Sequence, residues 1–166
     1  MYRTISDFLE DWKNESEATL KIFSALDNNS LNIKFNGYNR TLGKIAWHIT
    51  LMLPEMGETF NLPLKSMIKD APQPETIEEI NNTYKLASEE LAELIKNSWT
   101  DTSLTEVKTV YGQTFSNQTG LNMLVKHQIH HRGQLTVLMR LAGLKVPGIY
   151  GPAKEEWSAL GMPEVE

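Results

Sequence analysis

Three of the four histidines of this 166-residue chain lie in one segment, Val125-Lys126-His127-Gln128-Ile129-His130-His131-Arg132-Gly133-Gln134. The segment belongs to a longer run, from about Thr119 to Ala142, in which apolar residues recur at helical spacing. Gly143 follows at the position where glycine most often ends a helix. The run therefore predicts a long amphipathic helix with one face against a core.

Three further segments show the same periodicity. The first spans about residues 6–26, and the second begins at a predicted N-cap, Thr41, and carries apolar residues to Met56. Pro54 removes one backbone donor from the second segment, which predicts a kink or a restart there. The third opens at the capping box Thr76-Ile77-Glu78-Glu79 and continues to about Trp99. Together the four segments predict an all-α fold, a four-helix bundle in a single domain that spans residues 1–166.

The segments that connect these helices are long. Both loops among the first three helices exceed ten residues, so long crossover loops are compatible with the bundle. β-Branched and aromatic residues from Thr102 to Thr114 predict a short hairpin or an extended crossing. The tail, Val146–Glu166, is rich in Pro and Gly, and we expect it to wrap the surface of the bundle.

Bulk composition excludes several classes of protein. The apolar fraction of 40% and the charged fraction of 22% are ordinary for a globular protein, and the net charge of −5 gives no support to nucleic-acid binding. The absence of cysteine excludes disulfides, a thiol nucleophile and a thiolate metal site. No segment approaches the roughly 18 apolar residues of a membrane span, and the N-terminus has no apolar signal core. We therefore expect a cytoplasmic protein without a membrane partner.

The positions of the histidines on the predicted helices suggest a metal site. His127 and His131 are spaced i, i+4, so on a helix they lie one above the other. His127 lies at the edge of the apolar stripe and His131 lies within it. His48 lies at the margin of the apolar face of the second helix. Such margins line the grooves between helices, where bundles place metal sites. The pattern predicts one divalent metal ion bound by His48, His127 and His131.

Other interpretations of these residues stay open. A lone histidine such as His48 is often a hydrogen-bonded structural residue, and the pair on the last helix could be solvated or paired with carboxylates. His130 is turned roughly 100° from His131, and we interpret it as structural or interfacial. Arg132 and Gln134 could orient a ligand or substrate, although an exposed position on the helix is the simpler interpretation.

Another set of apolar residues lies off the main helix stripes: Trp47, Leu51, Met123, Val137 and Leu141. Apolar residues on a second helix face often mark a subunit contact, so we expect a homodimer. No catalytic residue or general base is identified; Glu55, about two turns after His48, is a weak candidate. Tyr111 and Gln113 could border the site or simply pack in their loop.

His48, the run His127-x-x-x-His131-Arg132-Gly133-Gln134-Leu135 and the tail Val146-Pro147-Gly148-Ile149-Tyr150-Gly151-Pro152 together resemble the DinB/YfiT-like family of metalloenzymes. The resemblance covers essentially the whole chain. It implies a four-helix bundle of down-up-up-down topology, usually a homodimer, and a divalent metal ion, zinc or nickel, held by the histidines that match His48, His127 and His131. Characterised relatives use low-molecular-weight thiols in transferase or isomerase reactions or are proposed hydrolases, and some members are known only as stress-inducible.

Two hypotheses about function follow. In the first, the protein is an enzyme, a transferase or hydrolase, whose metal activates water or a low-molecular-weight thiol against a small-molecule substrate. In the second, it is a stress-related metal-binding or interaction module without turnover. The sequence favours the enzyme, because structural zinc is normally closed by a fourth protein ligand and none is apparent here.

Overall fold

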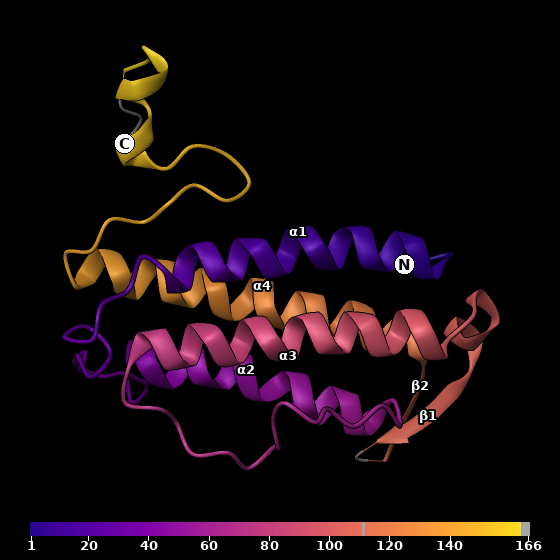
Figure 1. The fold of residues 1–166 in the computed structure, drawn as a ribbon. Coiled ribbons are helices and arrows are strands. Elements are labelled where there is room, and N and C mark those ends of the chain that lie inside the picture. Colours follow the sequence, from indigo (N-terminus) through magenta and orange to yellow (C-terminus); the bar gives the residue numbers. More distant parts are fainter. Residues whose placement is uncertain (111, 164–166) are drawn as a thin grey trace.

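The computed structural model describes residues 1–110 and 112–163, and its body is a bundle of four helices (Figure 1). The helices are α1 (Ile5–Phe23), α2 (Leu42–Thr59), α3 (Ile77–Ser98) and α4 (Asn117–Leu141). Around the bundle the order is α1, α3, α2, α4, so α1 and α2 each pack against both α3 and α4. The predicted four-helix bundle is confirmed.

The direction of the helices explains the long connections. α1 and α4 run one way along the bundle, and α2 and α3 run the other way (Figure 1). This is the down-up-up-down order that the resemblance implies. Residues 24–41 cross between the non-neighbouring helices α1 and α2, and residues 60–76 run back along the bundle to the start of α3.

The helix ends follow capping chemistry. Thr41 and Thr76 are N-caps as predicted, and each hydroxyl accepts a hydrogen bond from the backbone N–H three residues later. At the end of α4, Gly143 adopts a φ of 76°, and the Leu144 N–H donates to the Met139 carbonyl at 2.9 Å. The predicted end of α4 is therefore confirmed. α1 ends at Phe23, a few residues before the predicted end near Leu26.

Two features of α2 differ from the expectations. Of the kink or restart predicted at Pro54, the restart does not occur, because Pro54 lies inside one continuous helix and its φ is compatible with a helix. Trp47 is buried, and its Nε1–H donates to the Ala71 carbonyl at 3.0 Å, so the 60–76 connection covers it instead of a second subunit. Met123, Val137 and Leu141 on α4 are exposed as expected.

The link between α3 and α4 contains a small hairpin. A 3-10 helix, η1 (Asp101–Thr105), precedes the antiparallel strands β1 (Val107–Val110) and β2 (Gln113–Ser116). The predicted hairpin is confirmed, although its first residues are helical. Gln113 is exposed on β2, and Tyr111 lies outside the described residues.

The C-terminal tail returns to the bundle after α4. Lys21 on α1 donates to the Gly148 carbonyl at 2.7 Å, and Arg140 forms a two-pronged ion pair with Glu155. The short 3-10 helices η2 (Lys154–Glu156) and η3 (Ser158–Leu160) then stand off the body of the bundle (Figure 1). In the part of the chain that the structure describes, no helix has the length and apolar character to cross a membrane.

Candidate metal centre

His48 of α2 meets His127 and His131 of α4 in the groove between these two helices. The His48 Nε2 atom lies 3.0 Å from Nε2 of His127 and 3.1 Å from Nε2 of His131. All three ligand atoms lie within 4.8 Å of one another, and His131 is buried while the other two are half-buried. The structure therefore brings together the three histidines predicted from the sequence. His130 is exposed and lies outside this cluster.

Hydrogen bonds alone cannot account for the close contacts between the nitrogens of these three rings. A neutral imidazole nitrogen carries either one proton or one lone pair, so His48 Nε2 can make one good hydrogen bond. Two nitrogens nevertheless approach it at hydrogen-bond distance. A cation that accepts a lone pair from each ring would satisfy all three nitrogens at once.

The tautomer of His131 is fixed by its neighbour on the next helical turn. The His131 Nδ1–H donates to Gln134 Oε1 at 2.8 Å, which leaves the Nε2 lone pair directed at the cluster. The Gln134 amide in turn donates to His130 Nε2 at 3.1 Å, which fixes the orientation of that amide. Of the two roles considered for Gln134, the structure supports the one in which it orients a ligand. No equivalent partner orients His127, whose buried Nδ1 has none among the described residues.

Burial keeps the three imidazoles uncharged at neutral pH. The pKa of His127 is lowered from 6.5 to about 4, first by desolvation and then by the positive charges of neighbouring groups. Desolvation also lowers the pKa of His48 and of His131. A neutral imidazole has the lone pair that a metal ligand needs.

The two nitrogen separations at His48 fit ligands that share an ion. Two ligands bound at about 2.1 Å lie about 3.0 Å apart in octahedral geometry and about 3.4 Å apart in tetrahedral geometry. The distances from His48 Nε2 to the other two Nε2 atoms, 3.0 and 3.1 Å, match the first value. Three nitrogen ligands also leave coordination positions open. Among the described residues the cluster contains the three histidines and not Glu55.

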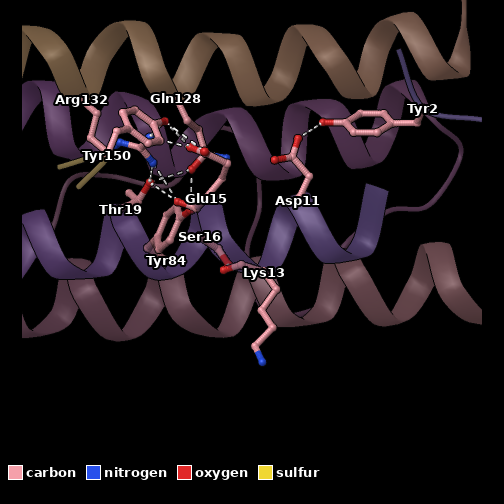
Figure 2. Close-up of polar contacts among 10 residues, drawn as sticks. All are labelled: Tyr2, Asp11, Lys13, Glu15, Ser16, Thr19, Tyr84, Gln128, Arg132 and Tyr150. Carbon is pink, nitrogen blue, oxygen red and sulfur yellow. Dashed lines mark hydrogen bonds and ion pairs between the residues drawn. The ribbon is translucent and has the colours of Figure 1, made fainter. Parts of the chain in front are cut away.

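A different face of α4 carries a buried polar network that the sequence analysis missed (Figure 2). Arg132 Nη2 lies 2.5 Å from Glu15 Oε2, and Nη1 donates to the Glu15 carbonyl at 2.8 Å. Tyr150 of the tail contacts the guanidinium and donates to the Glu15 carboxylate at 2.8 Å. The expectation that Arg132 is exposed is wrong, because its side chain is 3% exposed.

The network extends to α3 through Gln128. Its Oε1 accepts hydrogen bonds from the Tyr84 hydroxyl and from Thr19, whose hydroxyl lies 3.1 Å away (Figure 2). α4 therefore carries two i, i+4 pairs displaced by one residue, His127 with His131 toward α2 and Gln128 with Arg132 toward α1 and α3. The matching i, i+4 spacing of Glu15 and Thr19 on α1 is the only signal in the sequence that points to this network.

Comparison with known proteins agrees with this architecture. The model of the DinB family matches residues 1–165. The chain is 41% identical over 162 residues to the uncharacterized protein YrdA of Bacillus subtilis. The match covers 98% of this chain and 97% of the relative.

Two solved structures are also similar to the chain. The crystal structure of a DinB-like protein from Bacillus cereus has a TM-score of 0.85 and 39% identity, and the match covers 90% of this chain and 100% of the other. The DinB-like protein YjoA of Bacillus subtilis, at 14% identity, shares the fold with a TM-score of 0.69, over 86% of this chain and 96% of its own.

Proposed function

This chain belongs to the DinB family, and we propose that it is a metal-dependent enzyme in which His48, His127 and His131 hold one divalent ion. The observation that carries the proposal is the contact of two ring nitrogens with the same His48 Nε2 atom. The lowered pKa values of all three rings support it, because metal binding then does not have to displace protons at neutral pH.

The open coordination suits acid–base chemistry on a bound small molecule. When bound, a divalent ion with three neutral ligands keeps its full charge and lowers the pKa of a coordinated water or low-molecular-weight thiol. The protein residues hold the ligand nitrogens in place: Gln134 fixes the His131 ring, and the two α4 histidines are spaced by one helical turn. We propose a transferase or hydrolase reaction, with zinc or nickel as the metal, since imidazole ligands suit both.

Metal analysis of the protein purified without an affinity tag tests the site. One equivalent of zinc or nickel is expected in the unmodified protein, and His127→Ala is expected to lose it with its helix content kept. His130→Ala is the matched control, because His130 belongs to the same helix but is exposed and outside the cluster. Full metal occupancy in His127→Ala would contradict the assignment.

Turnover is tested separately from metal binding. The metal-free protein is reconstituted with zinc, nickel or manganese and assayed with a low-molecular-weight thiol and an aryl halide electrophile, and for hydrolysis of an aryl ester. Activity that appears with one of the metals and disappears with a chelator supports an enzyme. A protein that holds one metal ion but turns over neither substrate would support the binding module instead.

A further inference from the structure

Three large apolar side chains of the tail lie outside the core of this chain. They belong to residues 157–162, a segment that we call the apolar turn, which stands off the bundle beyond α1 (Figure 1). Leu160 is 56% exposed, Met162 is 44% exposed, and Trp157 does not pack against the core that the described residues form. The N–H groups of Leu160 and Met162 both donate to the Trp157 carbonyl, at 3.0 and 3.1 Å, so the turn is hydrogen-bonded. A structured segment with exposed apolar side chains is typical of a contact with another protein.

The tail is fixed to the side of the bundle just before the apolar turn. Glu155 pairs with Arg140 near the end of α4, with 2.6 Å between Oε1 and Nη1. The Glu156 carboxylate accepts hydrogen bonds from the backbone N–H groups of Gly148 and Ala153, at 3.1 and 3.0 Å. The chain itself therefore sets the path of the tail up to residue 156, and the apolar turn projects from a supported base.

The exposed face of α4 is hollow beside the ridge that Val137 forms. Val137 is 60% exposed and Leu141 is 69% exposed. On the helix, Gln134 is turned about 60° to one side of Val137, and Arg140 is turned about 60° to the other side. A cavity of about 350 Å³, the α4 cavity, lies on the Gln134 side and is lined by Phe35, Asn36, Tyr38, Gln134, Val137, Leu138 and Leu141. The α4 cavity and the base of the apolar turn therefore lie on opposite sides of one ridge.

The charges of the two surfaces are complementary. The α4 cavity is lined by residues from two segments, 28–54 and 107–154, and neither segment contains an aspartate or a glutamate. Exposed Lys34 directly precedes Phe35 of the lining. From residue 155 onward the sequence has no basic residue and four glutamates: Glu155, Glu156, Glu164 and Glu166. In a chain with a net charge of −5, this face is therefore one that does not repel the acidic tail.

We propose that two copies of the chain form a dimer in which the apolar turn of each copy occupies the α4 cavity of the other. Each copy presents a projection on one side of the Val137 ridge and a hollow on the other side. A two-fold axis at the ridge brings each projection to the hollow of the second copy, which is the self-complementary surface that a symmetric dimer requires. Gln134 lines the cavity and accepts the hydrogen bond from His131, so the turn of the second copy packs against the residue that orients this ring. The proposal goes beyond the proposed function and does not require a bound metal.

The absence of cysteine from the chain allows this contact to be tested by disulfide cross-linking. Leu160→Cys and Leu141→Cys are prepared as separate variants, mixed under reducing conditions to exchange subunits, and oxidised. We expect a cross-linked product of twice 18.9 kDa, in which peptide mapping joins positions 160 and 141. Leu86→Cys mixed with Leu160→Cys is the matched control, because Leu86 is 58% exposed but lies on α3, and it should cross-link far less. Equal yields for the two mixtures would overturn the proposal, as would a bond within one chain in the double variant Leu141→Cys/Leu160→Cys.

The dimer dissociation constant gives a second measurement that does not depend on disulfide geometry. Leu160→Asp/Met162→Asp is expected to raise this constant by about 10-fold or more, because it places charges in an apolar cavity, while Leu86→Asp should leave it within about twofold. Both positions of the double variant lie outside the core, so circular dichroism should show unchanged helix content. Light scattering across a concentration series, with and without added zinc, provides the constants. A monomeric parent protein, or a dimer that Leu160→Asp/Met162→Asp leaves intact, overturns the exchange of tails, and neither result affects the metal assignment.

Discussion

Replacing Glu15 with alanine is expected to destabilise the fold by about 3–5 kcal/mol, because the Arg132 guanidinium then stays buried without its counter-charge. The side chains of Arg132 and Glu15 are 3% and 9% exposed, so water cannot replace the lost carboxylate. The two hydrogen bonds from Nη1, to the Glu15 carbonyl and to Thr19, survive in this variant. The predicted loss therefore comes from the charge and not from the whole network.

The double variant Glu15→Leu/Arg132→Met separates the charge effect from packing. Removal of both charges removes the cost of an unpaired ion, and apolar side chains of similar volume are often neutral in such positions. The double variant is thus expected to be more stable than Glu15→Ala alone. Tyr150→Phe should cost about 1 kcal/mol, since it removes one hydrogen bond to the carboxylate from a residue that is 70% exposed.

Urea unfolding followed by far-ultraviolet circular dichroism measures these free energies. Glu155→Ala provides the control, because it breaks the partly exposed ion pair with Arg140 and should cost less than about 1 kcal/mol. A cost below about 1 kcal/mol for Glu15→Ala, or a double variant less stable than the single one, would refute the reasoning.

Three other predictions concern the cluster and the surface of α4. The metal-free protein should lose stability as the pH falls from 6.5 toward about 4, because the unfolded chain protonates His127 in that range while the folded chain does not; His127→Asn should flatten this dependence in urea unfolding curves measured across pH. Gln134→Ala should weaken zinc binding by about 10–100-fold in competition with a chelator, since it frees the His131 ring, and unchanged affinity would contradict that role. Light scattering should give twice the 18.9 kDa mass of one chain, and Met123→Lys with Leu141→Lys should shift the protein toward a monomer; a monomeric parent protein would exclude the dimer.

The helices could be predicted because their signals are local. The apolar period and the threonine caps act within a few residues of each helix, and they fixed the start of α2 and α3 and the end of α4. The burial of Trp47 could not be predicted in this way. It depends on the 60–76 connection, whose path along the bundle follows from the parallel arrangement of α2 and α3.

The histidine cluster was predictable for a similar reason. The spacing of His127 and His131 is a property of one helix, and the position of His48 at the margin of an apolar face directs it into a groove. Only the choice of neighbouring helices was missing, and the bundle order places α2 beside α4.

The burial of Arg132 could not be predicted from its position on a helix face. A charged residue next to a core face is normally taken as exposed, and its burial here depends on a carboxylate 117 positions earlier in the chain. Adjacent residues on a helix point about 100° apart, so the pair Gln128 and Arg132 faces α1 and α3 when the histidine pair faces α2. A rotation of α4 that broke either set of contacts would break the other as well. The buried network therefore holds α4 in the one rotational setting that directs both histidines at His48, and it does so with hydrogen bonds that do not require the metal.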